Sequence, residues 1–444
     1  MSIEPVSRRD FVRHAAGGAL LSSFVLEHFA SGVARPLIGT RPPFPAAESI
    51  KIGLIGCGGR GTGAAVQALR ADPNCSLVAM GDVFSERMES SLRAIRGEMG
   101  DAASTKAPVT PDRMHSGFSS YKQVIESDAD VVILTSYPNF RPAHLRAAVE
   151  AGKHVFAEKP VAVDAPGLRS VLESARLASE KNLALMIGFC WRYNDGMRAA
   201  FEQLASGAIG DIVSAHTTYH SGTLGRNPRQ PSWSDLEFQM RNWWHFTWLS
   251  GDHIVEQAVH SVDRLAWAVG DRIPQRVTCL GGRAARSGPE HGNVYDHFAA
   301  VYEYAGGMRG FHTCRQIDAC PSDNTDYIFG TSGSSVINGW VPTYVMRDRA
   351  GSETWRYRGD IRDMYQVEHD ELFASIRAGK PINDAVRGAN STLMAIMARM
   401  AAYTGQTITW EQALNSTEDL TPPIMEFGPL PTPPVAVPGQ TKFL

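Results

Sequence analysis

The sequence lacks the features that mark nucleic-acid-binding and membrane-spanning chains. It has no run of lysine or arginine long enough to follow a phosphate backbone, and its formal net charge is −3. Nucleic acid is therefore not an expected partner. The apolar stretch at residues 15–25 is well short of the ~20 residues that cross a bilayer, so we expect no span there.

Cysteine is also scarce. The 444 residues include six cysteines, with no CxxC pair and no zinc-ligand spacing among them. This pattern argues against the common zinc sites, and we expect no metal. We expect buried thiols that pack as small apolar side chains, with a single disulfide as the alternative.

What the sequence does contain is the composition of a folded protein with two domains. Hydrophobic residues make up 43% of the chain and charged residues 20%, which is typical of globular rather than disordered proteins. A length of 444 residues is too great for one ordinary hydrophobic core.

Residues 1–34 are predicted to be a twin-arginine signal peptide. Arg8 and Arg9 precede the short apolar stretch, and Gly32 and Ala34 place small side chains before a cleavage site at Arg35. Residues 35–48 contain four prolines and are predicted to be a linker. The protein is then expected to be periplasmic or otherwise exported, with no membrane span in its mature form. The alternative is a frayed basic N-terminus on a cytoplasmic protein.

Residues 49–193 are predicted to form an α/β domain with a parallel sheet. Short strands alternate with helices, and each strand is nearly all apolar, as in a sheet covered on both faces. The expected strands are 50–55, 77–80, 131–134, 154–157 and 183–187, and the expected helices are 62–70, 141–151 and a long one that Asp164 caps and that runs to Lys181.

The pattern changes after Tyr193. Residues 194–416 contain segments of period two joined by glycine turns, which predicts a mostly antiparallel sheet with one open face. The expected strands are 212–220, 277–281, 297–304 and 308–314, and the expected closing helices are 364–378 and 386–404. Residues 417–444 contain seven prolines, and we expect an extended arm rather than part of a core.

A glycine motif follows the first predicted strand. Gly56-Cys57-Gly58-Gly59-Arg60-Gly61 matches GxGxxG, and Asp82 follows Gly61 by 21 residues at the end of the second strand. In a dinucleotide site, Gly56 makes the tight turn, Gly58 admits the pyrophosphate, and Gly61 packs helix on strand. Gly59 and Arg60 are further predicted contacts. Asp82 would accept hydrogen bonds from ribose hydroxyls and repel a 2′-phosphate, which favours NAD; an incidental glycine turn is the alternative.

Further cofactor contacts are predicted where later strands end, because open α/β sheets bind ligands at that edge. Glu158, Lys159 and Pro160 follow strand 154–157, and a lysine there must have its charge compensated or used. Pro160 is a candidate cis proline; the alternative for Lys159 is an ordinary exposed loop residue. The other predicted cofactor contacts follow strand 131–134: Thr135, Asn139 and His144.

A carboxylate and an imidazole are predicted to share one helix face. Glu256, His260, Asp263 and Trp267 are spaced i, i+4, i+7 and i+11. Glu256 would orient His260 and raise its basicity, as a general base requires. The alternatives are a structural pair and a metal site, for which the sequence offers no second clear HxxxE or HxxH pair. Just upstream, Trp244 belongs to an aromatic stretch that would contact a sugar ring or pack the core.

Together these residues resemble the Gfo/Idh/MocA family, named for glucose–fructose oxidoreductase, inositol dehydrogenase and a rhizopine-catabolism protein. The matching segments are the glycine motif with Asp82, Ala151-Gly152-Lys153-His154-Val155, Glu158-Lys159-Pro160, Arg192-Tyr193-Asn194, and His260 with Asp263. The resemblance implies a Rossmann domain and then an α/β domain whose open sheet forms the substrate wall. Such a sheet often serves as a dimer face in this family, so a homo-oligomer is one expectation.

The resemblance also implies roles for individual residues. Lys159 and His260 would face the nicotinamide and the hydroxyl that is oxidised, with substrate contacts at Arg192, Tyr193, Trp244 and Asp263. In one respect the chain departs from the family, which commonly carries aspartate where this chain has Glu256. That difference puts the proton-transfer geometry in question.

The function predicted from these features is hydride transfer between tightly bound NAD and a secondary hydroxyl of a sugar or glycoside. One alternative is an NAD-dependent glycosidase that oxidises transiently, eliminates the aglycone and reduces the product again. The other is a non-catalytic ligand-binding protein, which would not need both Lys159 and His260. Export favours a cofactor that stays bound, because free NAD is not recycled outside the cytoplasm.

Overall fold

The computed structural model describes residues 44–45 and 47–444. The predicted signal peptide and most of the predicted linker lie outside the described residues. Among the helices of the described part, none combines the length and the apolar character needed to cross a membrane.

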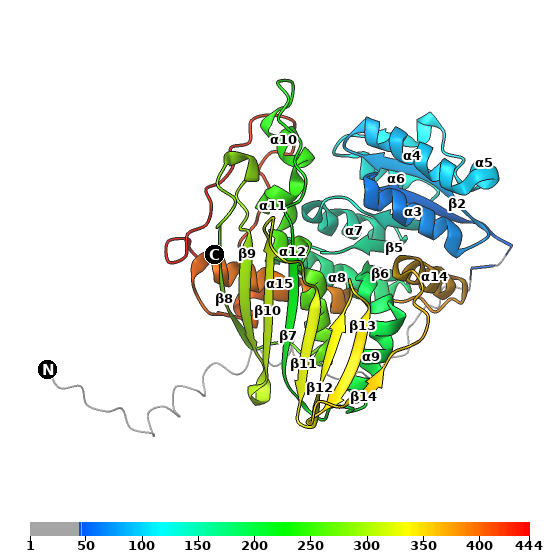
Figure 1. The fold of residues 1–444 in the computed structure, drawn as a ribbon. Helices are drawn as coiled ribbons and strands as arrows, with labels where there is room; N and C mark the ends of the chain where they lie inside the picture. The colour runs from blue at the N-terminus through cyan, green and yellow to red at the C-terminus, as the bar shows by residue number, and fades with distance from the viewer. Residues whose placement is uncertain (1–43, 46) are drawn as a thin grey trace, which may run out of the picture. The chain divides into compact units, whose positions relative to one another are not determined.

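The first domain is built on a six-stranded sheet in which all neighbouring strands are parallel, as expected (Figure 1). The strand order is β3-β2-β1-β4-β5-β6, so the chain reverses its direction of travel across the sheet after β3. Only the short edge strand β3 was not predicted, because its three residues are partly exposed and carry no apolar run. The strands are β1 Ile50–Ile55, β2 Cys75–Asp82, β3 Met114–Ser116, β4 Val131–Leu134, β5 His154–Glu158 and β6 Leu185–Gly188.

Helices cover both faces of this sheet, and their buried side chains form two hydrophobic clusters with the strands. Helices α3 and α4 lie on one face and α6, α7 and α8 on the other. The Asp164 side chain accepts a hydrogen bond of 2.9 Å from the Gly167 backbone N–H, which confirms the predicted cap of α8. The helices are α3 Gly59–Ala71, α4 Ser85–Met99, α5 Ala103–Lys106, α6 Ser120–Glu126, α7 Arg141–Glu150 and α8 Ala165–Glu180.

A helix from the second half of the chain completes the first core. Helix α14 (Met364–Arg377) buries Leu372 and Phe373 against the same cluster as Ile52 of β1. Its position could not be inferred from periodicity, because an amphipathic helix does not specify which sheet covers its apolar side.

The second sheet has nine strands in the order β14-β13-β12-β11-β7-β10-β9-β8-β15. Its neighbours are antiparallel apart from β7 and β10, so the sheet is mostly antiparallel, as predicted. The sequence predicted neither the strands β11 to β14 nor the two-residue strand β15. The strands are β7 Ile212–Ser221, β8 Arg276–Gly282, β9 His297–Glu303, β10 Arg309–Gln316, β11 Thr325–Gly330, β12 Gly333–Asn338, β13 Thr343–Asp348, β14 Glu353–Arg356 and β15 Ile408–Thr409.

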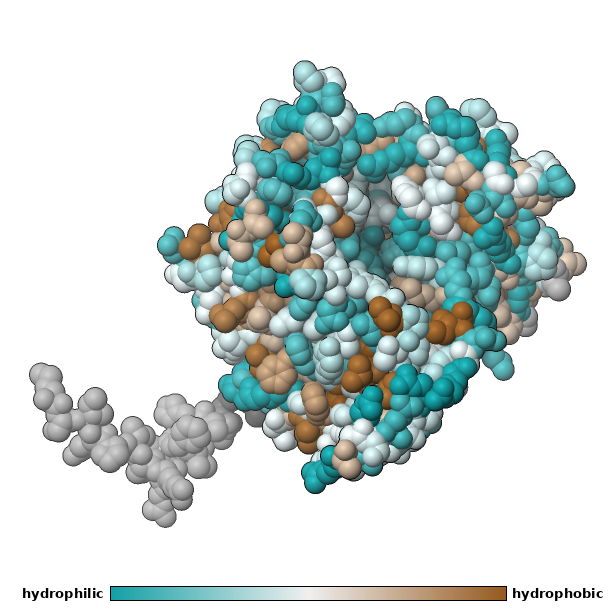
Figure 2. Space-filling view, viewed as in Figure 1, coloured by the Kyte–Doolittle hydropathy of each residue, from teal (hydrophilic) through white to brown (hydrophobic). Residues whose placement is uncertain are grey.

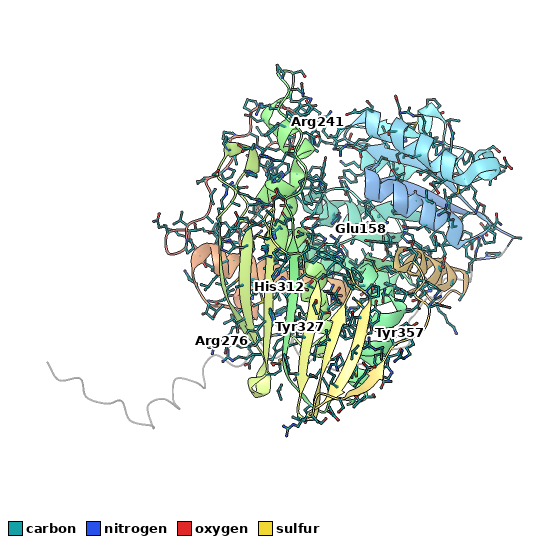
Figure 3. The ribbon with its side chains drawn as sticks, in the orientation of Figure 1. Glu158, Arg241, Arg276, His312, Tyr327 and Tyr357 are labelled. Carbon is teal, nitrogen blue, oxygen red and sulfur yellow. The ribbon has the colours of Figure 1, made fainter. Side chains whose placement is uncertain are left out.

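In the part of the chain that the structure describes, helices cover one face of the second sheet and leave the other open. On β10, His312 is fully buried whereas its neighbour Phe311 is 37% exposed, and Tyr327 of β11 is also exposed (Figure 3). This alternation is what a half-buried strand produces. The helices of this part are α9 Asp195–Ala205, α10 Asp235–Arg241, α11 Thr247–Ser250, α12 His253–Glu256, α13 Val259–Ala268, α15 Ala385–Thr404 and α16 Trp410–Asn415.

The C-terminal arm, residues 417–444, has no helix or strand, but it is not detached from the core as predicted. The Phe427 ring lies 5.8 Å from that of Phe84 and 5.2 Å from that of Phe118, both in the first domain. The Tyr295 hydroxyl donates a hydrogen bond of 2.8 Å to the Ala436 carbonyl. Proline prevents regular backbone hydrogen bonding but does not prevent side chains from packing.

Among the described cysteines, which include all six of the chain, none forms a disulfide. Five are buried, as expected, and Cys320 is exposed.

Candidate active site

A cavity of about 400 Å³ lies at the carboxyl ends of the first sheet's strands and extends to α12 and α13. Figure 2 shows the surface hollowed between the two halves of the chain, with hydrophilic side chains at its mouth. Most of the site residues predicted from the sequence line this cavity: Gly56, Gly58, Gly59, Arg60, Gly61, Asp82, Thr135, His144, Glu158, Lys159, Trp244, Glu256 and His260.

The glycine turn has the shape that a pyrophosphate needs. Gly56 has φ +94°, and a Cβ there would lie 2.5 Å from the Ser136 nitrogen. A Cβ on Gly61 would lie 1.9 Å from the Gly56 carbonyl oxygen. At Gly58 and Gly59, by contrast, a Cβ would meet nothing within 4 Å, so the backbone borders open space. Helix α3 begins there with no side-chain cap, which leaves its first N–H groups for an anion.

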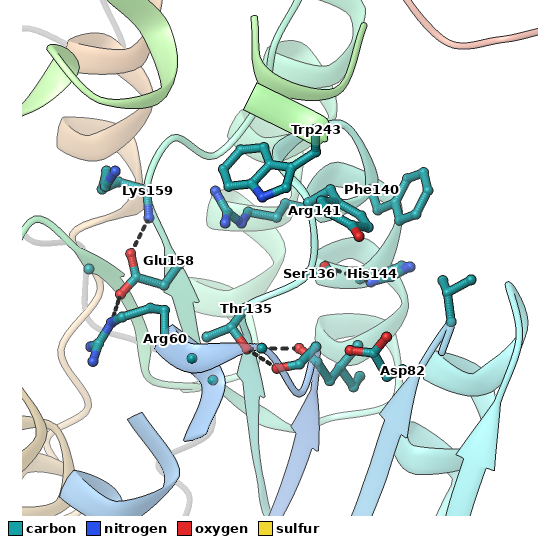
Figure 4. A pocket seen from close by; sticks show the side chains of 18 of the residues that line it. Arg60, Asp82, Thr135, Ser136, Phe140, Arg141, His144, Glu158, Lys159 and Trp243 are labelled. Atoms are coloured by element: carbon teal, nitrogen blue, oxygen red, sulfur yellow. Dashed lines mark hydrogen bonds and ion pairs between the residues drawn. The ribbon is translucent and has the colours of Figure 1, made fainter. Parts of the chain in front are cut away.

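Asp82 ends β2 and is 7% exposed at the cavity wall (Figure 4). Its carboxylate accepts hydrogen bonds from the backbone N–H groups of Cys57 (2.6 Å) and Phe84 (2.9 Å). Burial raises the pKa of this carboxyl, although the nearby Arg87 opposes the shift. The carboxylate thus braces the glycine turn and remains at the position where a ribose would lie. The glycine turn and Asp82 together fit NAD.

Side chains after β4 complete this end of the cavity. The Thr135 hydroxyl donates to the Gly56 carbonyl at 2.5 Å, which ties β4 to the glycine turn. Ser136 Oγ and His144 Nδ1 are 3.0 Å apart, and burial lowers the pKa of His144 to about 3. Asn139 does not line this cavity: it borders a neighbouring one, and its amide donates to Thr421 at 3.5 Å. The prediction for Asn139 is therefore not supported, because the turn after β4 directs it towards the C-terminal arm.

Arg60 and Glu158, both predicted as separate cofactor contacts, form an ion pair with each other. The Arg60 guanidinium donates to the Glu158 carboxylate and, at 3.1 Å, to Glu368 of α14. These bonds link the glycine turn, the end of β5 and the helix contributed by the second half of the chain. Arg60 and Glu158 still border the cavity, so their charges act on whatever binds there.

Lys159 reaches from the end of β5 to α12. Its Nζ donates a hydrogen bond of 2.6 Å to the Glu256 carbonyl oxygen and lies 3.9 Å from Glu256 Oε1. The Lys159–Pro160 peptide bond is cis, as the sequence suggested. Burial raises the pKa of the Glu256 carboxyl, and the Lys159 charge opposes that shift.

The predicted single helix carrying Glu256 and His260 does not exist. Helix α12 ends at Glu256 and α13 begins at Val259, so the i to i+4 relation is broken. Glu256 Oε2 and His260 Nδ1 have no hydrogen-bond partner within the described part of the chain. Glu256 therefore pairs with Lys159 rather than orienting His260. No group of three or more His, Cys, Asp or Glu side chains in residues 44–45 and 47–444 is placed to hold a metal.

His260 is 9% exposed and lines the cavity beside Lys159. Burial lowers the pKa of its imidazole well below the ordinary value, and the charges of Lys159 and Arg264 lower it further. The ring is therefore neutral at physiological pH.

Aromatic side chains form part of the cavity wall. The rings of Trp243 (Figure 4) and Trp244 have centroids 4.6 Å apart, and both line the cavity with Tyr219. Trp244 Nε1 donates to the Gly225 carbonyl at 3.2 Å, which fixes the orientation of its ring. Flat apolar faces with polar edges suit the C–H faces of a sugar ring.

Three predicted substrate contacts lie elsewhere. Arg192 donates to the Asp263 carboxylate at 2.8 and 2.9 Å and to Asp271 at 2.5 Å. Tyr193 is 4% exposed in the core of the first domain. None of Arg192, Tyr193 or Asp263 is among the residues that line the cavity. A buried guanidinium needs carboxylate partners, so Arg192 and Asp263 satisfy each other and their predicted substrate role is not supported.

The cavity also contains residues that the sequence reasoning missed: Arg87, Arg141, Tyr219, Trp243 and Gln257. Gln257 adjoins Glu256, and Trp243 adjoins Trp244, so proximity along the chain was an available signal. Arg141 and Tyr219 gave no such signal, because a helical arginine and a strand tyrosine usually indicate solvent exposure and core packing. Arg141 is 5% exposed, and burial lowers its pKa to about 10.

Comparison with known proteins gives two family matches. Residues 50–189 match the model of an oxidoreductase family with an NAD-binding Rossmann fold. Residues 197–336 match the model of the GFO/IDH/MocA C-terminal domain. The two matches cover most of both sheets described above.

Individual relatives match over part of their length. Inositol 2-dehydrogenase 3 of Saccharopolyspora erythraea is 29% identical over 262 residues, 59% of this chain and 65% of that protein. The 2,7-anhydro-N-acetylneuraminate hydratase of Escherichia coli is 28% identical over 192 residues, 43% of this chain and 46% of that protein. The chain thus spans less than two thirds of these relatives. A levoglucosan dehydrogenase solved with NADH and levoglucosan shares the fold, with a TM-score of 0.65 at 19% identity over 82% of this chain and 99% of that one.

Proposed function

Because the chain belongs to the Gfo/Idh/MocA oxidoreductase family, we propose that it oxidises a secondary hydroxyl of a cyclic polyol, sugar or glycoside with bound NAD. One observation carries the proposal. Lys159 from the first domain and His260 from the second line the same cavity as the glycine turn. The polyol and sugar substrates named for an inositol dehydrogenase and a levoglucosan dehydrogenase support this substrate class.

Side chains of this protein can accept the hydroxyl proton and stabilise the negative charge on the reacting oxygen. Bound NAD would supply the hydride acceptor. An alcohol gives up hydride readily only as its proton leaves, so a base must lie within about 3 Å of the hydroxyl. His260 is neutral and therefore has a lone pair to accept that proton. The Lys159 ammonium, held on the Glu256 carbonyl, keeps other N–H groups to bind the reacting oxygen and stabilise negative charge on it.

A second candidate is the redox-neutral cycle that breaks a glycosidic bond by elimination. The observation that favours it is Glu256: burial raises the pKa of its carboxyl, and Oε2 has no hydrogen-bond partner among the described residues. A protonated carboxyl at the cavity wall could donate a proton to a leaving oxygen. A hydratase among the relatives is consistent with chemistry that ends without net oxidation.

Purified protein with its bound NAD distinguishes the candidates. Myo-inositol, levoglucosan, D-glucose and an aryl β-glucoside would each be added while NADH absorbance and aglycone release are followed. NADH that accumulates with a free polyol supports the dehydrogenase, whereas aglycone release without net NADH supports the elimination cycle. His260→Ala serves as the control for chemistry at this site. If the protein binds NAD and a polyol but neither signal appears, both proposals fail and a binding protein remains.

We further propose that the protein leaves the cytoplasm by the twin-arginine route with NAD already bound. Arg8 and Arg9 ahead of a short apolar stretch support the proposal. Replacing both arginines by lysine should trap a precursor in the cytoplasm. Unchanged export of that variant would contradict the route.

A further inference from the structure

Three polar side chains form a chain of hydrogen bonds that ends at the cavity. Arg286 lies in the loop after β8, Gln316 ends β10, and Gln257 lies between α12 and α13. The Arg286 guanidinium donates to Gln316 Oε1, and Gln316 Nε2 donates to Gln257 Oε1 at 2.5 Å. Arg286 and Gln316 are 3% and 1% exposed, so the hydrogen bond between them is shielded from water.

The arginine at the start of this chain fixes the orientation of both amides. A guanidinium only donates hydrogen bonds, so the atom of Gln316 that faces Arg286 must be oxygen. The Gln316 NH₂ then faces Gln257, and the Gln257 atom that receives it must also be oxygen. The hydrogen-bond partners therefore determine which atom of each amide is oxygen and which is nitrogen.

The Gln257 NH₂ is consequently a hydrogen-bond donor whose orientation is fixed by Gln316 and Arg286. Gln257 lines the cavity with Lys159 and His260, and its NH₂ donates to no acceptor among the described residues. Arg286 is itself held, because Nη1 donates to the Tyr295 carbonyl at 2.6 Å. A donor that is preorganised before the ligand arrives recognises an oxygen acceptor at little entropic cost.

We propose that Gln257 determines substrate specificity by donating a hydrogen bond to an oxygen next to the hydroxyl that is oxidised, and that Gln316 and Arg286 are its positioning residues. This inference rests on the proposed function. Gln257 directly follows Glu256, the Lys159 anchor, and lies three residues before His260. The amide and the proposed base therefore enter the cavity from one short segment. Oxygens on adjacent carbons of a cyclic polyol match that arrangement, so the site selects vicinal polyols over simple secondary alcohols.

Gln316→Glu tests the inference without altering any group that touches substrate. A carboxylate can only accept hydrogen bonds. The new glutamate therefore still accepts the bond from Arg286, but it now needs a hydrogen-bond donor from Gln257. The Gln257 amide must turn over, and its carbonyl oxygen then faces the cavity. A residue with a merely structural role would not reverse the hydrogen-bonding preference of the site.

The readout compares monodeoxy and monodeoxyfluoro analogues of the polyol that is oxidised best. Fluorine can accept a hydrogen bond but cannot donate one, whereas the deoxy carbon does neither. In the natural protein, one position should favour fluoro over deoxy by severalfold in kcat/KM, mostly through KM, because the contact is present before and during reaction. Gln316→Glu should reduce that ratio to about one, with NAD affinity unchanged. Comparing the two proteins cancels the inductive effect of fluorine on hydride release.

An unchanged fluoro-to-deoxy ratio at every position in Gln316→Glu would overturn the inference. Should that variant not fold, Gln257→Glu makes the same comparison from a partly exposed position. If no polyol is oxidised, the proposed function has failed, and NAD-loaded crystals soaked in glycerol test Gln257 separately. A glycerol oxygen bonded to the Gln257 amide supports the donor role, whereas glycerol bound without that contact, or an empty site, overturns it.

Discussion

The Lys159 ammonium donates a hydrogen bond of 2.6 Å to the backbone carbonyl of Glu256. Lys159 directly follows strand β5 of the first domain, and Glu256 ends helix α12 of the second. A backbone carbonyl cannot be removed by changing a side chain, so this contact holds Lys159 whatever residue occupies position 256. The aspartate that the family commonly carries there would leave this hydrogen bond intact.

Lys159→Ala and His260→Ala should each lower kcat on the order of 10²-fold or more, because the first removes the cation that stabilises the reacting oxygen and the second removes the base. NAD affinity should stay nearly constant, since the glycine turn and Asp82 provide the main cofactor contacts. Steady-state kinetics and NAD titration measure both quantities. The matched control is Lys181→Ala, because the Lys181 ammonium also donates to a backbone carbonyl, that of Glu150, but lies outside the cavity. Near-normal turnover in His260→Ala would make Tyr219 the next candidate.

Asp82→Ala should weaken NAD binding and improve NADP binding. The change removes a carboxylate that would repel a 2′-phosphate. The positive charge of Arg87, which lines the same cavity, is then no longer opposed by Asp82 and attracts that phosphate. Fluorescence titration with both nucleotides gives the ratio of dissociation constants. The double variant Asp82→Ala with Arg87→Ala should lose the gain for NADP. Tight NADP binding by the unmodified protein would contradict the role of Asp82.

The protein should lose stability as pH falls below 6.5. Burial holds the pKa of His144, His245, His312 and His369 at about 3, against 6.5 for the unfolded side chain. The unfolded chain therefore binds more protons in this window, and stability present above pH 6.5 is lost as pH falls towards 3. Each group contributes up to about 1.4 kcal/mol per pH unit.

Guanidinium unfolding at about pH 7.5 and about pH 5.5 measures this loss. His312→Gln should reduce the pH dependence by about one proton. An equal free energy of unfolding at both pH values would show that these histidines are not held neutral by burial.

Phe427→Ala should weaken NAD binding severalfold and lower the free energy of unfolding by about 1 kcal/mol. The ring packs on Phe84 and Phe118, and Phe118 lines the cofactor cavity. Thermal unfolding with and without NAD measures both effects. Ile424→Ala, at a side chain in the same arm that is 67% exposed, is the control. Equal behaviour of the two variants would show that the arm does not support the cavity.

Local patterns were sufficient for the first domain. Strand β1, helix α3 and the glycine turn were predicted because a buried strand, a GxGxxG turn and an apolar helix face each leave a signal within a few residues. The strands from Thr325 to Arg356 were missed because they mix polar and apolar residues with only half their surface buried. Their pairing joins segments that carry little signal on their own.

The amino-acid sequence by itself determined the parallel sheet followed by a mostly antiparallel one, the dinucleotide turn, and the presence of the lysine and histidine on which the proposed function rests. Tertiary structure decided which groups meet. In the folded protein, the helix is interrupted between Glu256 and His260, and Glu256 contacts Lys159. Arg192 pairs with Asp263 outside the cavity. The reason is physical: spacing along a chain specifies which side chains share one element, whereas buried charges and hydrogen-bond donors find partners on other elements.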